Sequence, residues 1–533
     1  MDKSAITFSA VNTSHKFAKN AVLNIIGFGI TLPITILLTP YVLRILGKEK
    51  YGVWALAAVV TSYAQLSDIG MTTAIVKFIA EYCAKEEVDQ ISTVVSTTFF
   101  AFAIIGGLVT GSLLFLRQFI VVDILRVPLE LQSDAIFVIS GMVIIFYFNL
   151  LFSIFDSVLQ GVQRMDITNG ILVISRILRA IGMYLVLAAG MGLKGLILNS
   201  ALMSGINIGM NVIAVRLLIH GFVLHIRSCS LQTFKRIVAY AVNILMARLI
   251  GLGEEPINKI ILSRWGSLSY VAFYDIGYRI ADIGRGFISK GLLPLLPASA
   301  ELHGKGDYHQ LKSLLFSLLK LIITFGVPYV FLIVSIAQPL IQAWLGNGYI
   351  LSARALQVIM VVLLFQILVT PHYIILQGIG KPQVNTVNHL ISAIVNIAGA
   401  IILIRYLRFY GVLASMIIST LIAVVHLDVM LRQVLRIQMR EYLSIIPWKW
   451  LVGMFLWSLA LWYSGREMIN MSLTFLSFAG ISSLLYCLFL FPRTNSRSDR
   501  EFLLKVVQVV VESVTNARFA KKVTNRVRRV LVR

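Results

Sequence analysis

Two stretches decide the fold of this chain: Leu159-Gln160-Gly161 followed by Leu172-Val173-Ile174-Ser175, and Leu376-Gln377-Gly378 followed by His389-Leu390-Ile391-Ser392. Both lie where one long apolar segment ends and the next begins, and they are displaced by a constant 217 positions. A second echo, Leu46-Gly47 with Tyr51 against Trp265-Gly266 with Tyr270, has nearly the same displacement. The repetition predicts two similar bundles of membrane helices, a common build for transporters that rock around a central site.

The composition indicates a polytopic membrane protein. Of 533 residues, 58% are apolar, and the mean hydropathy is +0.86, which is too high for a soluble domain. About fourteen apolar runs reach the roughly 20 residues that cross a bilayer, so we expect an all-α fold with six spans in each lobe and two extra spans at the end. Twelve spans is the alternative. The expected spans are 21–45, 52–68, 92–116, 135–160, 169–189, 194–218, 237–262, 269–295, 314–341, 354–378, 385–405, 409–431, 446–464 and 472–492.

The net charge of +23 is spread over loops and helix ends, which favours membrane topology over a nucleic-acid partner. With fourteen spans, the basic segments fall on one side, so the positive-inside rule places both termini in the cytoplasm. A capping box and apolar spacing after Ser498 predict an amphipathic tail on anionic lipid, or docked to a cytoplasmic protein. The expected parts are an N-terminus (1–19), a first lobe (20–219), a linker (220–234), a second lobe (235–435), two extra helices (436–492) and a basic tail (493–533).

Sequence motifs for catalysis are missing. There is no G-x-x-x-x-G-K-[ST] phosphate loop, no H-E-x-x-H and no G-x-S-x-G, and no loop is long enough for a catalytic domain. Cys83, Cys229 and Cys487 fit no disulfide framework or zinc site. We therefore expect no enzymatic activity, no cofactor and no metal, although an intramembrane active site stays open as an alternative.

The first concentration of intramembrane charge is in span seven. Ionisable side chains inside spans are costly and usually face a bundle interior or a wet cavity. Arg248, Glu255 and Lys259 lie at i, i+7 and i+11, which places them on one face of a continuous helix. Glu255 and Lys259 are also one turn apart and form a potential ion pair.

A second polar stripe lies on span eight, where Arg279 is one turn from both Asp275 and Asp282. The stripe either faces the same cavity as span seven or simply neutralises itself and holds helices together. Arg176 and Arg179 add positive charge to span five. They either face the cavity or reach out to lipid headgroups.

Several motifs resemble those of a known family: Tyr51-Gly52-Val53-Trp54, Leu66-Ser67-Asp68-Ile69-Gly70, Leu159 to Arg164, and Leu376 to Pro382. In these the chain is similar to the polysaccharide flippases of the multidrug/oligosaccharidyl-lipid/polysaccharide exporter (MOP) superfamily, which includes O-antigen and capsule repeat-unit translocases. The resemblance covers roughly residues 18–435.

The resemblance implies a flippase in a bacterial inner membrane that moves an undecaprenyl-diphosphate-linked oligosaccharide outward by alternating access, through a cavity between two six-helix lobes. Membrane lipids, and a polysaccharide polymerase or glycosyltransferases, are the further expected partners. A diphosphate needs cations, and the expected substrate-binding residues are Arg248, Arg279, Arg176, Arg179 and Lys259. The expected ion-coupling residues are Asp282, Asp275 and Glu255. A drug/cation antiporter, a lipid II flippase and, less favoured, a polysaccharide-assembly enzyme are the alternative functions.

Overall fold

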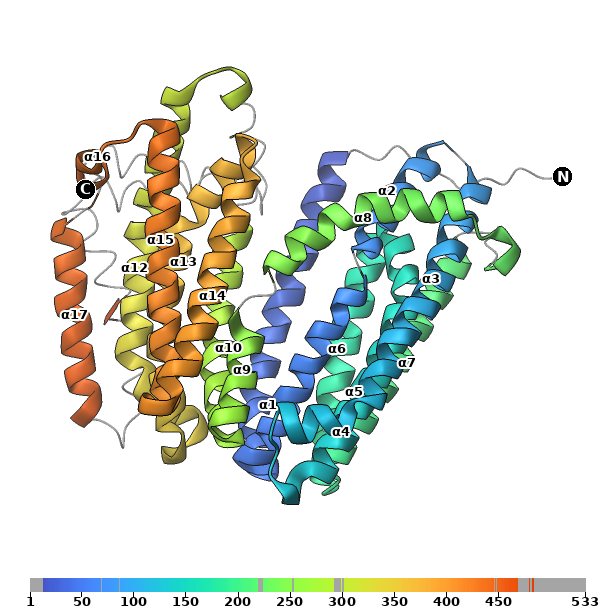
Figure 1. Ribbon diagram of the computed structural model, residues 1–533, viewed down its shortest axis with the longest axis horizontal. Coiled ribbons are helices and arrows are strands. Elements are labelled where there is room, and N and C mark those ends of the chain that lie inside the picture. The colour runs from blue at the N-terminus through green and yellow to red at the C-terminus, as the bar shows by residue number, and fades with distance from the viewer. Residues whose placement is uncertain are drawn as a thin grey trace. The chain divides into compact units, whose positions relative to one another are not determined.

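The structure is a computed structural model that divides into two compact units, Met1–Val271 and Ala272–Arg533 (Figure 1). Within the described part of the chain the secondary structure is helical, without β-strands, which confirms the all-α expectation. The described residues are 13–68, 70–85, 87–218, 224–251, 254–291, 299, 302–444, 446, 448–467, 479 and 482–483.

The first unit is built around a long central helix, α5, which contacts α1, α2, α3 and α7. Its inner face carries the fully buried side chains Ile154, Val158 and Leu159. The helices are α1 (Thr13–Ala64), α2 (Met71–Ala84), α3 (Val88–Phe115), α4 (Arg117–Phe119), α5 (Leu129–Gly161), α6 (Met165–Ala188), α7 (Gly192–Leu218), α8 (Leu231–Gly251) and α9 (Glu254–Trp265), with short 3-10 or π turns at Gln65–Asp68, Ile120–Ile124 and Ile226–Ser228.

In the second unit, α13 packs against both α12 and α15, α14 and α15 form a hairpin, and α17 lies on α12. A core of buried leucines, including Leu315 and Leu427, fills the space between α12, α13 and α15. The helices are α10 (Leu268–Gly291), which begins just before the unit boundary, α12 (Tyr308–Leu345), α13 (Ile350–Gly378), α14 (Pro382–Leu407), α15 (Phe409–Leu435), α16 (Met439–Ser444) and α17 (Trp448–Glu467), with a 3-10 turn at Asn347–Tyr349.

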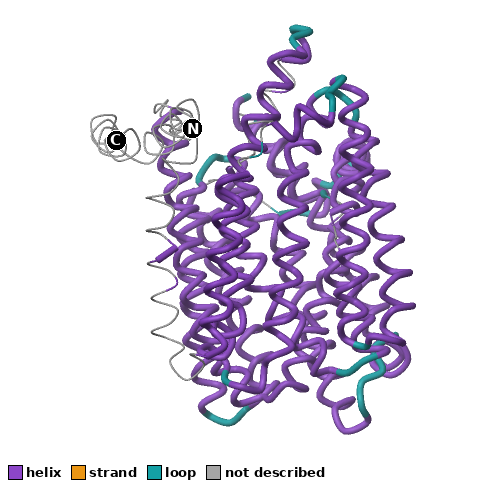
Figure 2. The backbone as a smooth tube through the Cα atoms, turned by 90° about the vertical axis from the view of Figure 1, so that its left-hand side faces the viewer, coloured by secondary structure: helices purple, strands orange, loops and turns teal. Residues whose placement is uncertain are grey.

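Eight helices among the described residues are long and apolar enough to cross a membrane. They match eight of the expected spans, and Figure 2 shows that described loops lie at helix ends. Nearly all of the expected span 472–492 and the whole tail 493–533 lie outside the described residues. The count of fourteen spans therefore stays a prediction. The expected division of the chain into lobes at 220–234 is a separate prediction that also stays open. The eight helices are Asp89–Phe115, Leu129–Gly161, Met165–Ala188, Gly192–Leu218, Tyr308–Leu345, Asn347–Gly378, Pro382–Leu407 and Phe409–Leu435.

The repeated stretch forms the same turn in both units. After α5, the Arg164 amide donates to the Leu159 carbonyl (2.9 Å), and after α13 the Lys381 amide donates to the Leu376 carbonyl (2.9 Å). The residue before each donor has a positive φ, 59° at Gln163 and 77° at Gly380. This is the hydrogen-bond pattern of a Schellman helix end. The sequence echo thus encodes one turn geometry, used twice.

The expected span 237–262 holds parts of two described helices, α8, which ends at Gly251, and α9, which begins at Glu254. Residues 252 and 253 between them lie outside the described residues, so the expectation of one continuous helix stays a prediction. Pro256 fits the first turn of α9, where its missing N–H is tolerated, and Glu254 and Glu255 favour a helix N-terminus. Glu255 and Lys259 lie together on α9, and the single helical face expected for them with Arg248 stays a prediction.

The expected first and second spans both lie within α1, which is bent at Gly47 (φ 75°, ψ 171°). A φ in this range favours glycine. The second part of α1 ends at Ala64 and leads through a 3-10 turn to α2. The Asp68 carboxylate accepts hydrogen bonds from the Thr72 amide (3.0 Å) and hydroxyl (2.8 Å), so this acid stabilises the start of α2.

Candidate functional site

The second unit holds a carboxylate–guanidinium pair on α10. Arg279 Nε lies 2.6 Å from Asp275 Oδ2, one helical turn away. The Asp275 side chain is only 4% exposed, whereas the Arg279 side chain is 38% exposed. A buried carboxylate is costly without a cation or a hydrogen-bond donor, and Arg279 supplies the cation for Asp275. The exposed part of the guanidinium can still meet an anion.

The third member of the expected stripe lies apart from this pair. Asp282 Oδ1 is 3.9 Å from Arg285 Nε, and both side chains are exposed. An ion pair of this length between exposed groups contributes little to stability. Arg279 thus forms an ion pair with Asp275, as expected. The second expected partner, Asp282, pairs instead with Arg285, the next arginine along α10.

The first unit holds a second pair, on α9, between Lys259 and Glu255. In this pair the cation is the more buried partner: the Lys259 side chain is 6% exposed and the Glu255 side chain is 23% exposed. Pro256 and Asn258 beside them are buried, and α9 packs against α1. Lys259 therefore pairs with Glu255, and its burial leaves little of it for a substrate.

The other cations expected to bind the substrate are Arg248, Arg176 and Arg179. The side chain of Arg248 on α8 lies outside the described residues. On α6, Arg176 is half-buried and Arg179 is exposed, next to exposed apolar neighbours such as Ile181. The Arg179 carbonyl accepts a hydrogen bond from Asn199 Nδ2 of α7 (3.1 Å), which fixes the backbone of α6 beneath the exposed side chain.

A charged network that the sequence did not reveal lies at one end of the second unit. Arg432 Nε is 2.8 Å from Asp428 Oδ2, and His372 Nε2 is 3.8 Å from the other carboxylate oxygen. His372 also lies 3.2 Å from the Tyr442 hydroxyl and stacks on its ring. Burial raises the pKa of Tyr442, so it stays a neutral phenol. The Asp428 and Arg432 spacing was visible in the sequence, but the contacts to α13 and α16 were not.

Polar groups farther along α13, α14 and α15 hold these helices together. Asn388 is fully buried, and its amide joins His426 Nδ1 (2.8 Å) to the Tyr373 hydroxyl. His389 stacks on the Tyr373 ring at 4.9 Å. Such residues can line a cavity or join helices, and these geometries correspond to helix contacts. Within the described ranges, no group of three or more His, Cys, Asp or Glu side chains is arranged to hold a metal ion.

The chain matches known families along most of its length. The family model described as "Polysaccharide biosynthesis protein" matches residues 17–303, and the MatE model matches residues 257–402. A Shigella flexneri protein named "Putative O-antigen transporter" is 23% identical over 409 residues, covering 75% of this chain and 93% of that protein.

Solved transporters share the fold. The lipid II flippase MurJ in an inward closed conformation aligns with a TM-score of 0.65 at 16% identity, covering 89% of this chain and 98% of that one. An inward-facing multidrug resistance MATE family transporter of the MOP superfamily aligns with a TM-score of 0.62 at 14% identity, covering 84% and 99%. These relatives are transporters and not enzymes. The chain belongs to the polysaccharide biosynthesis protein family and has the fold of the MOP superfamily.

Proposed function

We propose that this protein is a flippase for undecaprenyl-diphosphate-linked oligosaccharide repeat units, working by alternating access in the cytoplasmic membrane of a bacterium with both termini in the cytoplasm. Family membership and the O-antigen transporter relative support the polysaccharide substrate. Glycosyltransferases that build the repeat unit and a polymerase that extends it are the functional partners in this proposal.

The observation that carries the proposal is the Asp275–Arg279 pair on α10. Its carboxylate is buried and its guanidinium is partly exposed, so the helix presents a fixed positive group without leaving a buried charge unpaired. A guanidinium can bind two phosphate oxygens at once, which an ammonium cannot do with the same geometry. Arg176, Arg179 and Arg248 are the further phosphate ligands in this proposal, whereas Lys259 is buried against Glu255 and is left out of it.

Ion coupling is the second part of the proposal. Glu255 and Asp275 each have a basic partner one turn away, so a proton or sodium ion would bind only as that partner releases the carboxylate. Asp282 is exposed and pairs weakly with Arg285, which makes it the acid most easily reached by an ion. The membrane potential would add about 2.3 kcal/mol per charge per 100 mV.

The test compares two arginines on the same helix. Arg279→Gln should stop surface polysaccharide export and cause the lipid-linked precursor to accumulate in the inner leaflet, because the phosphate ligand is lost. Arg279→Lys should retain part of the export, since the charge stays but the fork is lost. Arg285→Gln, on the same helix and also exposed, is the matched control and should export normally.

Protein abundance in the membrane must be measured for each variant, because Arg279→Gln deprives Asp275 of this cation. The double variant Asp275→Asn with Arg279→Gln removes both charges and should restore abundance but not export. Normal export by an abundant Arg279→Gln protein would refute the assignment of this arginine to the substrate.

A further inference from the structure

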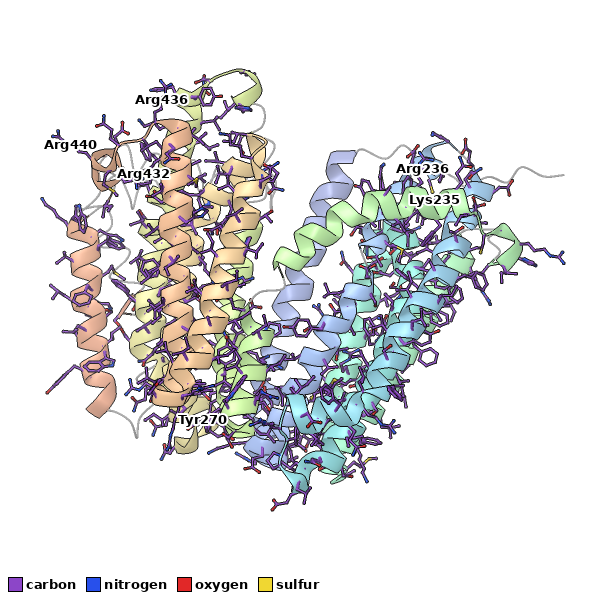
Figure 3. All side chains as sticks on the ribbon, in the orientation of Figure 1. Lys235, Arg236, Tyr270, Arg432, Arg436 and Arg440 are labelled. Carbon is purple, nitrogen blue, oxygen red and sulfur yellow. The ribbon has the colours of Figure 1, made fainter. Side chains whose placement is uncertain are left out.

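The connection from α15 to α17 exposes positive and apolar side chains together. Arg436, Arg440 and Lys449 are exposed, as are Met439 and Trp448; these five residues are termed the α15–α17 junction. Figure 3 shows Arg436 and Arg440 at the same end of the second unit, with Arg440 extending away from the helices.

The acids at this end are already paired with other cations. Asp428 pairs with Arg432 at 2.8 Å, and Glu441 pairs with Lys312 at 2.6 Å. The Gln438 amide also donates to Glu441 (3.0 Å). Among the described residues, no carboxylate lies within ion-pair distance of the three junction cations. Their charge is therefore available to an anion from outside the chain.

The backbone of the junction does not depend on its arginine side chains. Arg436 has a left-handed conformation (φ 51°, ψ 48°) at the end of α15, where glycine is the usual residue. The turn is closed by the Ile437 amide, which donates to the Arg432 carbonyl (3.1 Å). Ile437 itself is buried in the core of the unit. Replacing Arg436 by glycine thus removes a charge at a position whose conformation glycine adopts more readily.

We propose that the α15–α17 junction is a binding site for the headgroup of an anionic glycerophospholipid. Arginine suits a phosphodiester, and exposed Trp448 beside Lys449 is the arrangement found at the level of lipid headgroups. Met439 and Trp448 give apolar contact that a free phosphate would not use, which favours a lipid over inorganic phosphate. The chain's own C-terminal tail is rich in Lys and Arg, so like charge excludes it as the occupant.

The test uses the purified full-length protein in detergent, titrated with phosphatidylglycerol or phosphatidylcholine and read by native mass spectrometry. The unchanged protein should bind phosphatidylglycerol more tightly than phosphatidylcholine. Each basic side chain near an anionic surface contributes about fivefold, so Arg436→Gly with Arg440→Gln should weaken phosphatidylglycerol binding about 25-fold. Phosphatidylcholine binding should not change.

Arg405→Gln with Arg408→Gln is the charge-matched control, because these exposed arginines lie at the other end of the α14–α15 hairpin. It should change phosphatidylglycerol affinity by less than about twofold. An equal loss in both double variants would mean that net charge alone attracts the lipid, and would overturn the proposal. Competition by inorganic phosphate, or equal binding of the two lipids by the unchanged protein, would also overturn it. Arg436→Gly alone should unfold at or above the temperature of the unchanged protein, which separates loss of binding from loss of fold.

Discussion

Glu255→Gln should destabilise the first unit more than Lys259→Met, although the two residues form one ion pair. Removing the carboxylate leaves the Lys259 ammonium, only 6% exposed, without this partner. Breaking a buried pair costs about 3–5 kcal/mol, and because Glu255 is 23% exposed we expect about 2–3 kcal/mol. Removing the ammonium leaves a carboxylate that water reaches, and methionine fills the apolar space, so the expected cost is about 1 kcal/mol.

The measurement is the apparent unfolding temperature of the purified protein in detergent. For a unit of this size, 1 kcal/mol corresponds to about 2–4 °C. Glu255→Gln should therefore lower the unfolding temperature by about 4–12 °C, and Lys259→Met by about half of that or less. The double variant has no charge left to bury and should be more stable than Glu255→Gln. The reasoning fails if Lys259→Met is the more damaging change, or if the two losses simply add.

A close helix contact and the Lys312–Glu441 ion pair can be tested in the same way. Gly161→Ala should lower the free energy of unfolding by about 1–3 kcal/mol, because an added Cβ would lie 2.6 Å from Ile79 Cγ2. At Gly170 an added Cβ meets nothing within 4 Å, so Gly170→Ala should be nearly neutral. The unfolding temperatures of the two variants test this difference. The hydrogen bond from Lys312 holds the pKa of Glu441 below its ordinary 4.5. A lowered pKa stabilises the folded state above pH 4.5, and this effect is lost as the pH falls through the lowered pKa. Lys312→Met should therefore unfold at a lower temperature than the unchanged protein at pH 7, and the difference should disappear as the pH falls below 4.5 and Glu441 becomes protonated.

The repeated turn could be predicted because it depends on local chemistry. Gln163 and Gly380 occupy the positive-φ position of the same helix ending, and the residues immediately around each are enough to specify it. Hydropathy likewise located the eight helices that meet the criteria for crossing a membrane. Both signals come from residues close together in the chain.

Hydropathy does not show where a helix is interrupted inside an apolar segment, because it averages over a window. Leucine and isoleucine around Gly251 keep the average high, so hydropathy predicts one span over 237–262. Glycine costs about 1 kcal/mol in a helix interior, and proline also removes a hydrogen bond. Gly251, Gly253 and Pro256 together are therefore a local signal for a helix interruption that hydropathy does not register.

The His372–Asp428–Tyr442 network was missed for a different reason. Its members come from α13, α15 and α16, and His372 and Tyr442 are separated by 70 positions. Such a contact depends on how three helices pack, which a local pattern does not indicate. The ion pairs of α9 and α10, by contrast, follow from a spacing of four residues.

The two kinds of charged contact differ in how they can take part in transport. The pairs Glu255–Lys259 and Asp275–Arg279 each lie within one helix, so their geometry is set by that helix and is retained when the helix moves as a rigid body. The His372 network joins three helices. If these helices moved apart, the buried His372 would lose its contacts with the Asp428 carboxylate and the Tyr442 hydroxyl. In the proposed alternating-access cycle, the single-helix pairs can change their surroundings without an unpaired buried charge at any step. The three-helix network instead belongs to a part of the second unit that should move as one body.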